Sequence, residues 1–164
     1  MNKSYQDLVE SYPLLFMKEE GEARLPVSLF GFECDIGWYN IIRASFEEVY
    51  SNYEHQLSLY KSWKSFAPCE RYSQEQLDLL VEEYRQKTEE EKEKLPIILQ
   101  IKEKFGTLRI YSSYEDERVR AIFSMAEKMS EVTCEICGNA GITYRAGWHR
   151  TLCPKHAKEM GKIN

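Results

Sequence analysis

The chain has 164 residues, which is enough for one domain or for one domain with a small appendage. Hydrophobic residues make up 43% and charged residues 30%, as is ordinary for a soluble protein, and no apolar run approaches the roughly 18 residues of a membrane span. The net charge of −5 argues against broad coating of nucleic acid. The first seven residues lack the apolar core of a signal peptide, so we expect a cytoplasmic protein without a membrane partner.

The N-terminal third predicts a short helix, a loop and an extended segment. Residues 4–12 form the helix, with Ser4 as its cap and Asp7 in its first turn, and Pro13 ends it. Residues 18–26 are polar and predict a loop. Residues 27–33 are apolar and are expected to form a short strand.

A long helix is expected next, because apolar residues recur at every third or fourth position for about seven turns. Asp35 precedes this run and can serve as its N-cap. The apolar stripe comprises Trp38, Ile41, Ile42, Phe46, Val49, Tyr50, Tyr53, Leu57, Tyr60 and Trp63.

Ser73 and Gln76 have the spacing of a capping box and predict the start of another helix. Its buried edge is expected to contain Leu77, Leu80, Val81 and Tyr84. Residues 86–94 have no apolar side, which is typical of a solvated helix end.

Residues 97–111 alternate between apolar and polar and therefore predict a β-hairpin with one wet face. Phe105 and Gly106 form the turn, where Gly106 can adopt a positive φ. The inward set is expected to be Ile97, Leu99, Ile101, Leu108 and Ile110. A helix over residues 117–130, capped by Asp116, should follow and pack through Val119, Ile122, Phe123, Ala126 and Met129.

The C-terminal segment contains two tight pairs of metal-binding residues, Cys134-x-x-Cys137 and Cys153-x-x-His156, separated by fifteen residues. This pattern predicts a tetrahedral Zn²⁺ site. Four protein ligands leave no place for water, so the zinc should be structural and not catalytic. His149 precedes Cys153 by four residues and is the alternative fourth ligand, although the three-residue spacing favours His156.

The rest of this segment suits a treble-clef or zinc-ribbon-like subdomain. Residues 142–144 and 148–152 can pair as a second hairpin, and Pro154 suits the first position of a terminal helix that extends to about residue 162. We therefore predict an α+β fold in which several helices, one of them long, pack against a small antiparallel sheet. The predicted domains are a body of residues 1–133 and a zinc-binding subdomain of residues 134–164 packed on it.

Three segments together resemble a family of uncharacterised bacterial and bacteriophage proteins. They are the hairpin Ile101-Lys102-Glu103-Lys104-Phe105-Gly106-Thr107-Leu108-Arg109-Ile110-Tyr111, the zinc motif with Gly147-Trp148 and Thr151-Leu152 between its ligand pairs, and residues 31–39. The resemblance covers most of the chain and implies a phage or prophage context. It brings no catalytic residues, and only the four zinc ligands carry over from it.

A basic and aromatic surface is the other candidate site. Exposed cations on a hairpin commonly only solubilise it, but beside aromatic rings they can also bind phosphate and stack on bases. The candidate residues are Lys102, Lys104, Arg109 and Tyr111 on the first hairpin, and Arg145, Trp148, His149 and Arg150 in the zinc segment.

Three functions remain open from the sequence. The favoured one is a zinc-stabilised binding or regulatory protein, such as a phage accessory factor that docks on a host protein. A nucleic-acid-binding zinc module is the alternative. An enzyme is less favoured, whether an HNH-like nuclease using His149 or a thiol nucleophile at Cys34 or Cys69 with His55. No small-molecule substrate is evident.

Overall fold

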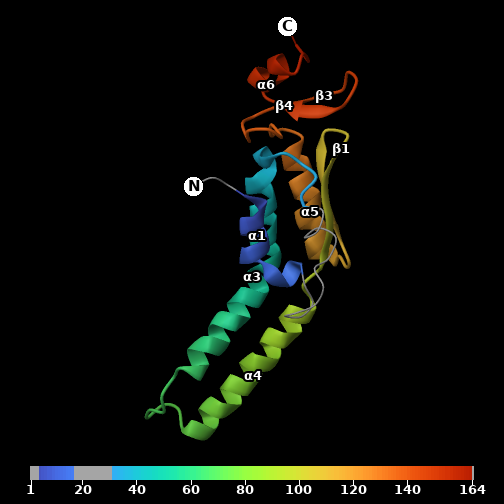
Figure 1. Cartoon of the computed structure of the whole chain (residues 1–164). Coiled ribbons are helices and arrows are strands. Elements are labelled where there is room, and N and C mark those ends of the chain that lie inside the picture. Colours follow the sequence, from blue (N-terminus) through green and yellow to red (C-terminus); the bar gives the residue numbers. More distant parts are fainter. Residues whose placement is uncertain (1–3, 17–30, 164) are drawn as a thin grey trace. The chain divides into compact units, whose positions relative to one another are not determined.

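The computed structural model describes residues 4–16 and 31–163, and it has the predicted α+β fold (Figure 1). Helices accompany two separate antiparallel sheets of two strands each. The chain divides into two compact units, one formed by Met1–Glu48 with Pro96–Asn164 and the other by Val49–Leu95. Among the described residues, no helix combines the length and the apolar character that crossing a membrane requires. The predicted boundary between residues 133 and 134 stays a prediction.

The first described elements are helix α1 (Tyr5–Ser11) and the 3-10 turn η1 (Pro13–Leu15). The capping box that Ser4 forms with Asp7 confirms the predicted helix start. The predicted loop at residues 18–26 and most of the predicted strand at 27–33 lie outside the described residues. At the end of that predicted strand, Glu33 forms an isolated parallel bridge with Lys102, exchanging backbone hydrogen bonds of 2.9 Å with Ile101 and Glu103.

The long helix begins differently from the prediction. A 3-10 turn, η2 (Ile36–Trp38), precedes helix α3 (Tyr39–Lys64). Asp35 occupies the N-cap position of η2 and not of the α-helix, and its carboxylate accepts no capping hydrogen bond, so the predicted capping of the long helix by this side chain is wrong. Its carboxylate instead pairs with Arg150, which lies 115 residues away in the chain.

The Val49–Leu95 unit contains the second half of α3 and helix α4 (Gln74–Glu93). The capping box of Ser73 and Gln76 is present, as predicted. Leu77 is buried, and the Trp63 ring of α3 stacks on the Tyr84 ring of α4 at a centroid distance of 6.3 Å. Ion pairs between residues three or four positions apart line the last turns of α4, but Thr88 is only 5% exposed, so the expectation that this end is solvated on all faces is wrong at that position.

Strands β1 (Ile98–Lys104) and β2 (Thr107–Ser112) form the predicted hairpin. Their register shifts between Ile98 and Gln100, which marks a β-bulge. Because a bulge reverses the alternation of side chains, Ile98 is fully buried and Leu99 is 39% exposed. The predicted inward position of Leu99 is therefore wrong, whereas Ile101, Leu108 and Ile110 are buried as expected.

The β1–β2 turn consists of Phe105 and Gly106, both with positive φ (55° and 81°). Two left-handed residues match the strand twist in a two-residue hairpin turn, and glycine suits the second of them. Phe105 pays a conformational cost there, because a bulky side chain rarely adopts this region.

Helix α5 (Glu117–Ser130) packs against β2 (Figure 1). Asp116 caps it by accepting a hydrogen bond from the Val119 N–H, as predicted. Val119, Phe123 and Ala126 are buried, but the predicted inner residue Met129 is exposed. Ser130 is fully buried in its place, and its hydroxyl accepts a 2.8 Å hydrogen bond from the Leu108 N–H of β2.

Replacing Ser130 with alanine should lower the free energy of unfolding by about 1–3 kcal/mol, because the buried Leu108 N–H loses its acceptor. Urea denaturation would measure the change. Ser124→Ala, on an exposed position of the same helix, is the matched control and should change stability by less than about 0.5 kcal/mol. Equal effects of the two substitutions would contradict the proposed role of this hydrogen bond.

Candidate metal centre

The C-terminal segment folds into a small hairpin followed by a short helix. Strands β3 (Ile142–Tyr144) and β4 (Arg150–Leu152) pair antiparallel as predicted, although β4 begins at Arg150 and not at the predicted residue 148, and Thr143 lies opposite Thr151. Helix α6 (Pro154–Glu159) begins with its proline at the first helical position and ends before the predicted residue 162. Cys153 occupies the N-cap.

The structure brings the four predicted ligand atoms together, within 4.8 Å of one another. The His156 Nδ1 lies 3.4 Å from the Cys134 Sγ and 3.3 Å from the Cys153 Sγ, and the Cys137 and Cys153 sulfurs are 3.8 Å apart. A tetrahedral zinc with Zn–S bonds of about 2.3 Å separates two sulfurs by about 3.8 Å. Cys134, Cys137, Cys153 and His156 could therefore hold a metal ion.

The local backbone explains why these side chains converge. Gly138 has a positive φ of 78°, and its N–H donates a 2.8 Å hydrogen bond to the Cys134 carbonyl, which closes the turn between the first two cysteines. At the second pair, the His156 backbone N–H at the start of α6 lowers the pKa of the Cys153 thiol. A lowered pKa favours the thiolate, which is the form that binds metal.

The His156 ring is oriented for coordination through Nδ1, because its other nitrogen faces a carboxylate. The Nε2 lies 3.7 Å from Glu159 one turn along α6. Carboxylates beside the second ring nitrogen commonly fix metal-binding histidines. His149, the alternative ligand, lies outside the cluster, and its ring lies 6.0 Å from the Phe105 ring.

The Cys134–Gly138 turn is docked on the segment that precedes α3. The Gly37 N–H donates a 2.7 Å hydrogen bond to the Glu135 carbonyl, and the Trp38 indole N–H donates a 2.8 Å bond to the Thr133 carbonyl. A Cβ on Gly37 would lie 2.2 Å from the Cys134 carbonyl oxygen, so only glycine fits this contact. Trp38 is fully buried.

An ion-pair network joins the same segments. The Glu135 side chain is only 4% exposed, and its carboxylate lies 2.9 Å from the guanidinium of Arg150, which also pairs with Asp35. Burial raises the pKa of Glu135, while Arg150 and the Asp35 backbone N–H counteract that rise. Arg150 thus offsets part of the cost of burying this carboxyl group.

This network removes part of the predicted binding surface. Arg150 is 19% exposed and is committed to two carboxylates. Arg109 pairs with Glu127 at 2.7 Å. The Lys102 ammonium lies over the Tyr111 ring at 5.3 Å and the Lys104 ammonium over the Phe105 ring at 5.6 Å. The predicted residues that remain exposed at the β3–β4 loop include Arg145 and Trp148.

Sequence reasoning did not identify three residues near the cluster: Asp35 and Glu135, which pair with Arg150, and Phe105, which lies beside His149. Phe105 could have been noticed in the sequence, because a bulky residue in a two-residue turn is unusual. No sequence pattern indicates that Arg150 pairs with Glu135 and Asp35, which lie 15 and 115 positions away in the chain.

Of the two cysteines considered as nucleophiles, Cys34 is unsuited to that role. Cys34 lies 3.4 Å from the Tyr5 hydroxyl, and burial raises the pKa of its thiol to about 12. Since the thiolate is the reactive form, this raised pKa disfavours Cys34 as a nucleophile at neutral pH. Cys69 is exposed, and neither residue forms a disulfide.

No family model matches the chain, and the searches of the curated proteins and of the solved structures also give no match.

Arg150→Met should lower the unfolding free energy of the metal-loaded protein by about 3 kcal/mol, because it leaves the Glu135 carboxylate buried without a cation. Adding Glu135→Gln should restore most of that loss, since the neutral amide tolerates burial better. Urea denaturation at fixed zinc concentration would measure both variants. The control is Arg43→Met, which removes an exposed pair with Glu47 and should cost at most about 1 kcal/mol. An Arg150 effect no larger than the Arg43 effect would contradict a stabilising network.

Proposed function

We propose that the Cys3His cluster binds Zn²⁺ as a structural ion, and that the protein acts as a binding or regulatory factor with a protein partner. The observation that carries the proposal is the convergence of three sulfurs and one imidazole nitrogen at tetrahedral spacings. Thiolate-rich tetrahedral sites select zinc, and a site filled by four side chains offers no position for a substrate. Function then resides on the protein surface.

Charge favours a protein partner over nucleic acid. The chain has a net charge of −5, and Arg109 and Arg150, two of the cations expected to contact phosphate, are paired with carboxylates. An acidic protein associates preferentially with basic partners. The resemblance to bacterial and phage proteins supports a phage or prophage accessory factor that docks on a host protein in the cytoplasm. The segment 134–164, with ligands in a turn and at a helix start, supports a treble-clef type of zinc subdomain.

Serine substitution of Cys134 or Cys153 should abolish stoichiometric zinc binding and expose the C-terminal segment to proteolysis. His156→Ala should have the same effect, whereas His149→Ala should retain the zinc. Elemental analysis of the purified variants would measure zinc per chain. Cys69→Ser is the matched control, because this exposed cysteine is not in the cluster. Because the thiols must lose protons to bind the ion, zinc should also dissociate as the pH falls.

Zinc retained by the Cys134 or Cys153 variants would refute the proposed site. Retention by His156→Ala together with loss from His149→Ala would assign the fourth ligand to His149. A water molecule on the bound ion in a crystal of the zinc-loaded protein would refute the structural role.

Nucleic-acid binding is the second candidate, since Arg145 and Trp148 both remain exposed on the β3–β4 loop. We expect the zinc-loaded protein to bind single-stranded oligonucleotides only weakly. Fluorescence anisotropy of labelled DNA and RNA at two salt concentrations would test this. Tight binding that weakens steeply with salt would favour the second candidate, because phosphate contacts release counterions.

A further inference from the structure

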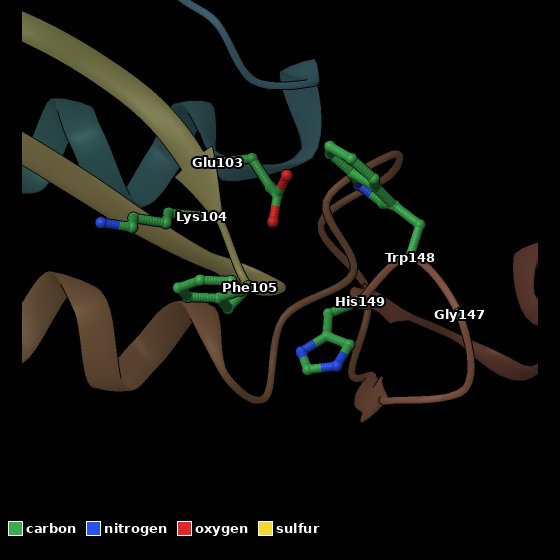
Figure 2. Close-up of a pocket in the computed structure, with 6 residues that line it drawn as sticks. All are labelled: Glu103, Lys104, Phe105, Gly147, Trp148 and His149. Atoms are coloured by element: carbon green, nitrogen blue, oxygen red, sulfur yellow. The ribbon is translucent and has the colours of Figure 1, made fainter.

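A hollow of about 300 Å³ lies between the β1–β2 turn and the β3–β4 loop. It belongs to the compact unit that also contains the metal centre. Figure 2 shows the Phe105 ring on one side and the Trp148 and His149 rings on the other. The remaining lining residues are Glu103, Lys104 and Gly147.

Hydrogen bonds hold the two walls of this hollow in place. The Thr151 hydroxyl donates a 2.6 Å bond to the Gly106 carbonyl, which fixes the β1–β2 turn against β4. Lys162 donates to the carbonyls of Ala146 and Trp148, at 2.8 and 2.7 Å, which braces the β3–β4 loop. The site is thus formed before any ligand arrives, which lowers the entropic cost of binding.

Two large aromatic rings that line the hollow are highly exposed to solvent. Phe105 is 67% exposed and Trp148 is 74% exposed. Phe105 is held in left-handed backbone geometry, with a φ of 55°, which costs free energy and projects its ring from the turn. Strained residues that present a side chain to solvent are concentrated at functional sites.

Glu103 gives the hollow a negative charge. Its Oε1 accepts a 2.6 Å hydrogen bond from the Gly106 N–H, and Figure 2 shows the carboxylate directed into the space between Phe105 and Trp148. Among the described residues no cation pairs with this carboxylate. The side chain of Lys104 extends away from the hollow, with its ammonium over Phe105.

From this geometry we infer that the hollow binds a cationic side chain of the partner protein, specifically an arginine; this inference rests on the proposed protein-binding function. Aromatic faces attract cations, and the attraction grows where water is excluded. A guanidinium is planar, stacks on aromatic rings and forms paired hydrogen bonds with a carboxylate, which an ammonium does not. A phosphate would meet the uncompensated Glu103 charge instead.

The test uses the full-length zinc-loaded protein and the probe acetyl-Gly-Gly-Arg-Gly-Gly-amide. The matched control peptide contains citrulline, which keeps the shape of arginine but has no charge. Titrations followed by ¹H–¹⁵N NMR should shift the Gly106 amide and the Trp148 indole signals, with a dissociation constant on the order of 1 mM for a single side chain. The citrulline peptide should bind about tenfold more weakly.

Variants locate the binding to this hollow. Glu103→Gln keeps an acceptor for the Gly106 N–H but removes the charge, and Trp148→Ala removes one ring; each should weaken the arginine peptide about five- to tenfold. Leu79→Ala, an equally exposed apolar residue in the other compact unit, is the control and should leave affinity unchanged. Lys104→Ala should leave affinity unchanged or increase it, because it removes a like charge.

Equal binding of the citrulline peptide, or no shift at Gly106 and Trp148, would overturn the inference. A single-stranded oligonucleotide that shifts the same signals and requires Lys104 would overturn it in favour of a base-stacking site. If either result is obtained with a protein that still holds one zinc per chain, the arginine pocket is refuted but the proposed zinc site is not. Loss of the zinc site itself would instead be seen in the elemental analysis of the cysteine variants.

Discussion

The contact between the Cys134–Gly138 turn and the segment before α3 is the constraint on which the rest of this unit depends. Gly37 lies against the turn so closely that a methyl group would overlap the Cys134 carbonyl, and Trp38 donates its indole N–H to Thr133. Arg150 adds a charge between the Asp35 and Glu135 carboxylates. Because Trp38, Cys134 and Glu135 are buried and Gly37 leaves no room for a side chain, these contacts hold the ligand turn against the start of the long helix.

The same arrangement positions the aromatic hollow between the β1–β2 turn and the β3–β4 loop. Arg150 is anchored in β4, so the loop that precedes it, with Trp148 and His149, is held beside the Phe105 turn. Thr151, next to Arg150, bonds the other side of that turn. The cluster of sulfurs and imidazole and the aromatic hollow thus share one small scaffold, and a metal ion bound at the cluster would help to order both.

Much of the secondary structure could be predicted because its signals are local. The capping boxes at Ser4 and Ser73, the Asp116 cap and the two-residue turn at Phe105-Gly106 each depend on residues within three or four positions. The bulge after Ile98 could not be predicted, since it is a change in how β1 pairs with β2 that no local pattern marks, and it places Leu99 outward. Met129 was placed on the inner side by helical spacing, but the buried position is Ser130, whose hydroxyl accepts a hydrogen bond from β2.

The sequence by itself determined which four residues form a cluster that could hold a metal ion, because two tight Cys/His pairs carry their spacing in the chain and converge through local turns. Only the tertiary structure decided which basic residues remain available for binding. From the sequence, Arg109 and Arg150 were expected to be exposed. In the structure Arg109 pairs with Glu127 of α5, and Arg150 pairs with Asp35 and Glu135. These ion pairs join residues far apart in the sequence. The packing of the whole unit determines which carboxylate meets each arginine, and no local sequence pattern indicates it.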